Sequence, residues 1–241
     1  MKPVLIIRTG RAPDPIRARH GDFPHWFRLG AQLAPERVRV VDVAAGEALP
    51  PPGEVAGALI TGSAAMVTER AAWSERTAGW IRDAMDLELP LFGVCYGHQL
   101  MAHALGGRVD YLPGGREIGT MLIRVAEHAK DDAVASTLPA SFRAHTTHEQ
   151  SVLELPKGAS VLAGSERDPH HLLRYGKNAV SVQFHPEFNA DVMRAYIHRK
   201  RADMHREGFD PHHTFRQVAP TPIARRLMRY FSRHHGMAAL R

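Results

Sequence analysis

The single cysteine of the chain, Cys95, stands in the segment Gly93-Val94-Cys95-Tyr96-Gly97-His98-Gln99. An apolar strand over residues 89–95 runs into a sharp, glycine-flanked turn, and a helix is predicted to begin directly after it. This is the pattern of a nucleophile elbow, which holds a side chain at the carboxyl edge of a sheet. The positive end of the helix dipole lies at this turn and favours the thiolate form of Cys95. The alternative is a small buried hydrophobe, as lone cysteines usually are.

A second segment, Gln183-Phe184-His185-Pro186-Glu187, carries an imidazole and a carboxylate at the end of another predicted strand. Residues two apart in an extended chain face the same way, so the side chains of His185 and Glu187 can lie side by side. A carboxylate beside an imidazole fixes its tautomer, while the other ring nitrogen serves a nucleophile. The alternative is a surface ion pair at a strand end. Together with Cys95, the pattern predicts a thiol–base–carboxylate triad.

These two segments resemble the two signature motifs of class I glutamine amidotransferases. Three further segments resemble parts of the same family, more narrowly the stand-alone, GMP-synthase-like amidotransferases: residues 59–63, 116–119 and 145–149. The resemblance spans most of residues 3–190. It implies hydrolysis of the side-chain amide of L-glutamine through a γ-glutamyl thioester, with release of ammonia.

The resemblance gives the triad its roles. Cys95 is expected to be the nucleophile, His185 the general base and then the acid, and Glu187 the carboxylate that orients the imidazole. Because a degenerate copy of the fold would be expected to lose Cys95 or His185, the intact triad favours an enzyme over a non-catalytic binding or regulatory module.

The resemblance also assigns the groups around the triad. The oxyanion hole is expected to be formed by the backbone N–H of Tyr96 together with that of Gly62 or Ser63. Gln99, one helical turn after the nucleophile, is expected to help bind the glutamyl part of the substrate. His148 stands where the family has a residue of a substrate-side loop, and it too is expected to bind substrate.

The predicted elements position these residues. Strands are expected at 4–7, 38–43, 56–60 and 89–95, and helices at 23–33, 73–87 and 97–105. This alternation predicts an α/β fold with a mostly parallel central sheet and helices on both faces. Short apolar runs at 118–125, 160–164, 172–175 and 179–184 predict an antiparallel extension of that sheet. The resemblance implies the flavodoxin-like fold of class I amidotransferases.

Charge divides the chain unevenly. Residues 1–190 hold 20 Lys and Arg against 21 Asp and Glu, whereas residues 191–241 hold 11 against 4. We therefore predict an amidotransferase domain over residues 1–190 and a basic helical extension over 191–241, packed on the same domain. Helices are expected at 189–206 and 221–235. No aromatic-interleaved basic motif accompanies the charge, so nucleic-acid binding is not expected.

Several ligands and locations are not expected. The chain has no phosphate-binding loop of the Gly-x-x-x-x-Gly-Lys-Ser/Thr type and no ATP pyrophosphatase motif, so neither a cofactor nor a nucleotide is predicted. The adjacent histidine pairs diverge in regular structure, and no metal site is predicted. With no apolar run long enough for a signal or a membrane span, we expect a cytoplasmic protein.

The expected partners follow from the lack of a synthetase motif in the sequence. Without a synthetase domain, the ammonia is expected to pass to a separate synthetase partner. The alternative within enzymes is a γ-glutamyl peptidase or hydrolase, which would use the same triad on γ-glutamyl amides or glutathione-like conjugates.

Overall fold

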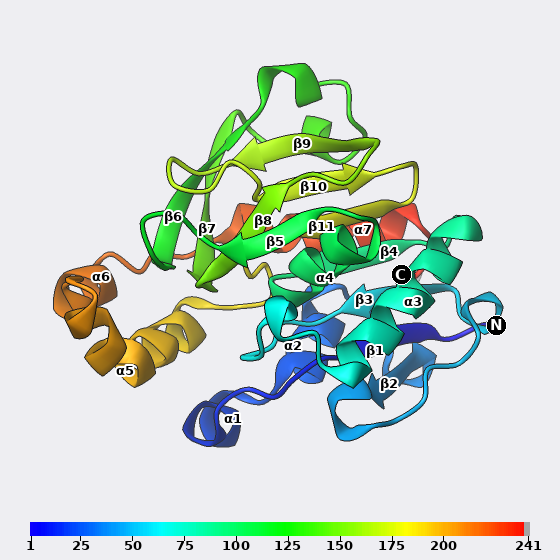
Figure 1. Cartoon of the computed structure of the whole chain (residues 1–241), viewed down its shortest axis with the longest axis horizontal. Coiled ribbons are helices and arrows are strands. Elements are labelled where there is room, and N and C mark those ends of the chain that lie inside the picture. Colours follow the sequence, from blue (N-terminus) through cyan, green and yellow to red (C-terminus); the bar gives the residue numbers. More distant parts are fainter. Residues whose placement is uncertain (239–241) are drawn as a thin grey trace.

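The computed structural model describes residues 1–238. Its main sheet has nine strands in the order β2-β1-β3-β4-β11-β10-β9-β6-β7 (Figure 1). The first five in this order run parallel: β2 (Val38–Asp42), β1 (Val4–Arg8), β3 (Gly57–Ile60), β4 (Leu91–Val94) and β11 (Ala179–Val182). The other four run antiparallel: β10 (Leu172–Tyr175), β9 (Ala159–Gly164), β6 (Glu117–Val125) and β7 (Ser141–His148).

The parallel strands are apolar on both sides because helices cover both faces of the sheet. Along β1, Val4 and Ile6 face one apolar core, and Leu5 and Ile7 face the other. The first core includes α2 (Phe23–Gly30) and α7 (Pro222–His234), and the second includes α3 (Ala72–Asp86) and α4 (Tyr96–Ala104). The predicted fold class, a parallel α/β sheet with an antiparallel extension, is confirmed.

The elements that the sequence analysis did not find lie mainly in the second half. Residues 141–148 form β7, which pairs along its whole length with β6. Inward positions of β7 include His145 and His148, so the strand lacks the apolar alternation that predicts a half-buried strand. A separate two-stranded sheet joins β5 (Arg108–Tyr111) to β8 (Gln150–Glu154), and a short helix α1 (Asp14–His20) precedes α2.

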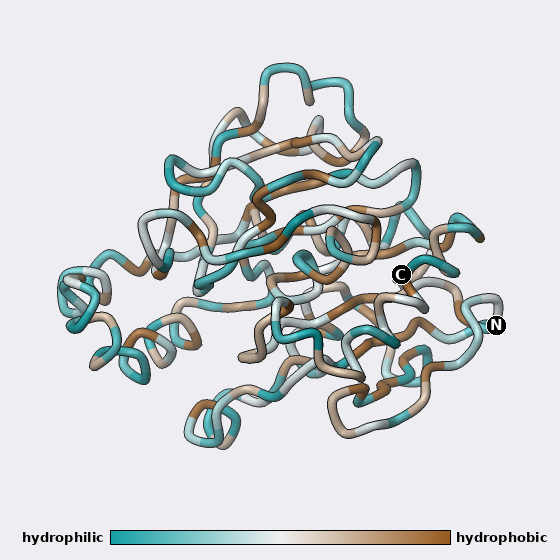
Figure 2. Tube along the Cα trace, viewed as in Figure 1, coloured by the Kyte–Doolittle hydropathy of each residue, from teal (hydrophilic) through white to brown (hydrophobic). Residues whose placement is uncertain are grey.

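The basic C-terminal region is helical, as the sequence predicts, and consists of α5 (Ala190–Arg206), α6 (Pro211–Arg216) and α7. Hydrophilic colour marks much of α5 and α6 in Figure 2, and hydrophobic colour marks the central strands. By contrast, α7 is part of the core: the ring of Phe231 lies 5.1 Å from that of Phe92 in β4. The domain boundary at residue 190 stays a prediction. Among residues 1–238, no helix is both long and apolar enough to cross a membrane.

Candidate active site

Cys95 lies at the junction of β4 and α4, with backbone angles φ 52° and ψ −104°. A positive φ at a residue with a Cβ is strained, and such strain is held in place by the surrounding structure. Here two backbone hydrogen bonds hold the turn: Cys95 N donates to Val182 O at 2.8 Å, and Gly97 N donates to Thr61 O at 3.1 Å. The elbow is thus tied to both neighbouring strands, β11 and β3.

The two glycines flanking Cys95 allow this close packing. A Cβ on Gly97 would lie 2.5 Å from the carbonyl oxygen of Ile60 in β3. A Cβ on Gly93 would lie 2.6 Å from the carbonyl oxygen of Gly97. Because both obstacles are backbone atoms, a larger residue at either position would force α4 away from the sheet.

His185 and Glu187 follow β11 and form the expected pair. His185 Nδ1 and Glu187 Oε1 are 2.7 Å apart, and both side chains are buried. His185 Nε2 has no hydrogen bond of good geometry to any atom of residues 1–238. A Cβ on Gly62 would lie 3.1 Å from His185 Cε1 and 3.6 Å from Cys95 Cβ, so the imidazole and the thiol both border Gly62.

The charges of this pair favour a reactive thiol. Burial raises the pKa of Cys95, but opposing effects, of which the charge of His185 is the largest, outweigh burial and hold the pKa below its ordinary value. Burial lowers the pKa of His185, whereas the charges of Glu187 and Cys95 raise it to about 10. The arrangement therefore favours a thiolate beside an imidazolium.

The loop after β3 is held by Thr9. The Thr9 hydroxyl shares its one proton between the carbonyl oxygens of Thr61 at 2.8 Å and Gly62 at 3.0 Å. The C=O and N–H of one trans peptide point in opposite directions, so the N–H groups of Gly62 and Ser63 are turned away from Thr9. Within residues 1–238 these two N–H groups have no acceptor. Their role in an oxyanion hole with Tyr96 stays a prediction.

Gln99 and His148, the expected substrate-binding residues, meet at one backbone carbonyl. Gln99 Nε2 donates to Gln150 O at 2.7 Å, and His148 Nδ1 lies 3.0 Å from the same oxygen. Gln99 Nε2 also donates to Gln183 Oε1 at 3.0 Å. Neither side chain lines the cavity at Cys95, so their expected contact with substrate stays a prediction.

A cavity of about 260 Å³ opens over Cys95 and His185. Ser63 and Thr147 line it, and one wall is a face of α5 that the sequence analysis left without a catalytic role: Tyr196, Arg199, Lys200 and Asp203. These residues recur at helical spacing, and this spacing is the signal in the sequence from which the wall could have been predicted. Lys200 pairs with Glu149 at 3.1 Å, whereas Arg199 has no ion pair within the described chain.

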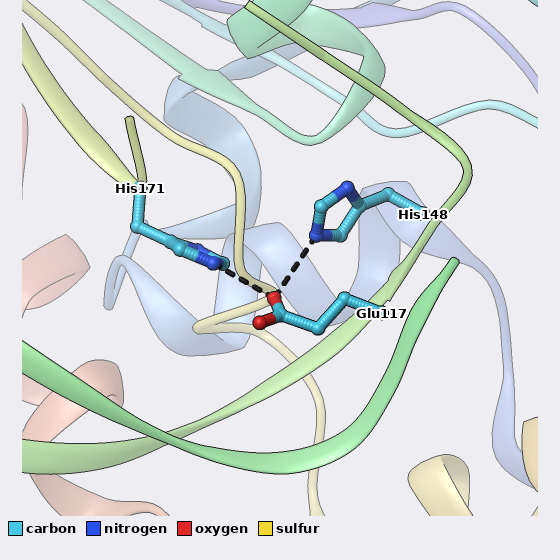
Figure 3. A group of neighbouring side chains, drawn as sticks. All are labelled: Glu117, His148 and His171. Carbon is cyan, nitrogen blue, oxygen red and sulfur yellow. Dashed lines mark hydrogen bonds and ion pairs between the residues drawn. The ribbon is translucent and has the colours of Figure 1, made fainter. Parts of the chain in front are cut away.

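A buried charged group that the sequence analysis missed lies in the antiparallel half (Figure 3). Glu117 Oε2 is 3.1 Å from His148 Nε2 and 2.8 Å from His171 Nε2. A zinc ion with bonds of about 2.0–2.2 Å would hold tetrahedral ligands about 3.3–3.6 Å apart, and no fourth ligand is grouped with these three within residues 1–238. The geometry is that of a hydrogen-bonded ionic cluster.

Comparison with known proteins agrees with this fold. The family model "Glutamine amidotransferase class-I" matches residues 38–203. γ-Glutamyl peptidase 4 of Arabidopsis thaliana is 30% identical over 62% of the chain and 60% of its own length. The GMP synthase [glutamine-hydrolyzing] of Thermosipho africanus is 36% identical over 47% of the chain and 21% of its own length.

Solved structures show the same fold over nearly the whole chain. A glutamine amidotransferase from Thermotoga maritima superposes with a TM-score of 0.77 at 21% identity, covering 98% of both chains. A glutamine amidotransferase from Methylobacillus flagellatus gives a TM-score of 0.70 at 19% identity, covering 98% of this chain and 94% of its own. The fold and the family match together define the class: the chain belongs to the class I glutamine amidotransferase family, whose relatives include GMP synthases and γ-glutamyl peptidases.

Proposed function

We propose that this protein is a cysteine hydrolase of γ-glutamyl amides, with L-glutamine as its substrate and ammonia and glutamate as products. The observation that carries the proposal is the convergence of Cys95 and the His185–Glu187 pair on one cavity. The relatives named as glutamine-hydrolysing or γ-glutamyl enzymes support a γ-glutamyl amide as the bond that is hydrolysed.

The reaction proceeds in two halves. The Cys95 sulfur attacks the amide carbon of the substrate, and the oxyanion that forms accepts hydrogen bonds from the N–H of Tyr96 and that of Gly62 or Ser63. His185 then gives its proton to the departing nitrogen, the C–N bond breaks, and a γ-glutamyl thioester remains. His185 next takes a proton from water, which attacks the thioester and restores Cys95.

The route of the ammonia is part of the proposal. The chain matches 21% of the length of the GMP synthase of Thermosipho africanus. We infer that a separate synthetase partner accepts the ammonia, and that basal glutamine hydrolysis rises when the partner binds.

Replacing the nucleophile tests the mechanism. Cys95→Ala should remove glutamine hydrolysis, measured as glutamate formed, because no other thiol exists in the chain. A control is Met101→Leu, a change of similar volume in the apolar core of α4, which should retain activity. Unchanged turnover by folded Cys95→Ala would remove this mechanism, and no turnover of any γ-glutamyl amide by the wild type would favour a non-catalytic module.

A second candidate is a γ-glutamyl peptidase that acts on peptides or glutathione-like conjugates. The α5 wall of the cavity favours it, because Arg199 presents an unpaired positive charge to a leaving group that bears a carboxylate. A panel of glutamine, neutral γ-glutamyl amides and γ-glutamyl peptides separates the two candidates by their kcat/KM values.

A further inference from the structure

The charge state of His148 follows from its two hydrogen-bond partners. Its Nδ1 lies 3.0 Å from the backbone carbonyl oxygen of Gln150, and its Nε2 lies 3.1 Å from Oε2 of Glu117. A carbonyl oxygen and a carboxylate can only accept, so both ring nitrogens must donate. An imidazole with two N–H groups is an imidazolium.

Glu117 is fixed as the accepting partner. The Ser165 hydroxyl oxygen accepts the backbone N–H groups of Arg167 at 3.2 Å and Asp168 at 3.0 Å, so its own proton points to Glu117 Oε1 at 2.6 Å. His171 Nε2 lies 2.8 Å from Glu117 Oε2. Burial raises the pKa of Glu117, but its hydrogen bonds to His148 and His171 bring it well below the ordinary value. These contacts favour an ionised Glu117, which is the state that a doubly protonated His148 requires.

The charged ring is coupled to the nucleophile. Gln99 donates to the same Gln150 carbonyl as His148, and the N–H of Gln99 bonds to Cys95 O at 3.0 Å in the first turn of α4. The positive charge of His148 lowers the pKa of Cys95, and the thiolate in turn raises the pKa of His148, which burial alone would lower. The coupling acts through the protein interior, since Thr147 rather than His148 lines the cavity.

We propose that Glu117 and the Gln150 carbonyl hold His148 as a buried imidazolium that stabilises the Cys95 thiolate, in addition to the imidazolium of His185. His148 is then a positioning residue that acts on the nucleophile without touching substrate. The proposal takes from the proposed function only that Cys95 is the nucleophile. It can be tested without any substrate.

A second buried histidine provides the control. His98 Nδ1 lies 2.7 Å from the Ser181 hydroxyl oxygen, and that hydroxyl gives its own proton to the Tyr175 oxygen at 3.1 Å. His98 Nδ1 therefore donates, and its Nε2 has no partner within the described chain. This ring is neutral, and burial lowers its pKa to about 3.

The other charged groups that face Cys95 stay in place in the variants. Glu187 and His185 face Cys95 from the segment after β11. Tyr196 faces it from α5, and burial raises the pKa of the Tyr196 hydroxyl. The remaining charged residues around the cavity are Arg11, Arg199, Lys200 and Asp203.

The rate of alkylation of the single thiol by iodoacetamide, followed by intact mass against pH, measures the thiolate. Relative to the wild type, His148→Gln should move the midpoint up by about one pH unit. Glu117→Gln should move it up by less, because His148 loses its proton when the carboxylate is gone. If Glu117→Gln acted only by removing a negative charge near Cys95, the midpoint of alkylation would move down instead. His98→Gln should leave it in place.

An unchanged midpoint in folded His148→Gln, or a lower one in Glu117→Gln, overturns the proposal. Nitrogen NMR of the wild type labelled at histidine guards against variants that fail to fold: it should show two buried imidazolium rings at pH 8. A single such ring, or one equivalent of bound zinc in the purified protein, contradicts a protonated His148. Failure of glutamine hydrolysis with these shifts intact refutes the proposed function alone.

Discussion

The parallel and antiparallel halves of the main sheet contribute differently to the site. The parallel half presents Cys95, the Gly62 loop and His185 at the carboxyl ends of β4, β3 and β11, which are adjacent strands. The antiparallel half adds Thr147 to the cavity and buries the cluster around Glu117 beside it. The two halves are joined by the pairing of β11 with β10 and, next to the site, by a bond from His185 N to His145 O at 2.8 Å. The reacting groups lie on one half, and part of their support lies on the other.

The interiors of the two halves also differ. Strands β1, β3 and β4 bury only apolar side chains and glycine, whereas β6 and β7 bury Glu117, His145 and His148. Buried polar groups require specific partners, so they fix geometry more strictly than apolar packing does. From this contrast we expect substitutions in the parallel half to lower the rate of the reaction most, and substitutions at the edge of the cavity to change the preference among substrates.

The largest effect is expected at Glu187. In Glu187→Gln the imidazolium of His185 loses its carboxylate, so kcat/KM for glutamine should fall about 10³-fold. Glu75→Gln is the matched control, because Glu75 pairs with His103 at 3.0 Å away from the cavity. Steady-state kinetics measures both, and a fall of less than threefold in Glu187→Gln would contradict the role given to this carboxylate.

The next effect concerns the packing of the elbow. Gly97→Ala places a Cβ against Ile60 O and should lower the free energy of unfolding by about 2 kcal/mol in urea titrations. Gly79→Ala in α3 is the control, because its Cβ would approach nothing closer than 3.7 Å, and it should stabilise the protein by up to about 1 kcal/mol. Equal stability of the two variants would show that the elbow tolerates a looser contact.

The sequence predicts the parallel half well because its signals are local. Apolar runs and glycine punctuation located β1, β3, β4 and α4, and the chemistry at Cys95, His185 and Glu187 lies where those elements end. The family match confirmed the resemblance that these motifs carry.

The antiparallel half was less predictable because its signals are not local. β7 alternates exposed and buried residues only in its first half, and its buried positions include polar side chains whose partners are distant in sequence. Glu117 and His171 are 54 residues apart, and the pairing of β6 with β7 and β9 and of β9 with β10 brings this half together. The α5 wall was likewise not predicted, because the helical spacing of its residues also fits a basic helical face in solvent, which is the usual case.

The buried neutral histidines predict how stability depends on pH. Burial lowers the pKa of His98 to about 3 and that of His145 to about 4, below the unfolded value of 6.5. The unfolded state then binds more protons, so the free energy of unfolding should fall by about 1 kcal/mol per pH unit for each ring as pH drops below 6.5.

Urea titrations at several pH values between 4.5 and 6.5 check this dependence. His98→Gln should show a shallower slope than the wild type. His148 and His185 act oppositely, because their pKa values are raised: their stabilisation is complete below pH 6.5 and is lost as pH rises through the folded values. A wild-type slope that His98→Gln leaves unchanged would mean that this ring is not buried in its neutral form.

The smallest effect is expected at the edge of the cavity. Arg199→Gln should reduce the preference for γ-glutamyl peptides over neutral γ-glutamyl amides by about threefold. The reason is that an exposed ion pair between Arg199 and the peptide carboxylate contributes less than about 1 kcal/mol to binding. Arg226→Gln on α7 removes an exposed charge outside the cavity and should leave the ratio of kcat/KM values unchanged. Equal ratios in both variants would remove Arg199 from substrate selection.

Trapping the covalent intermediate tests the central claim most directly. Wild-type protein mixed with glutamine and quenched in acid within milliseconds should carry one glutamyl group on Cys95, detected by intact mass and peptide mapping. Cys95→Ala should carry none. Glutamate formation by the wild type with no adduct, or with an adduct at another residue, would contradict a thioester at this elbow.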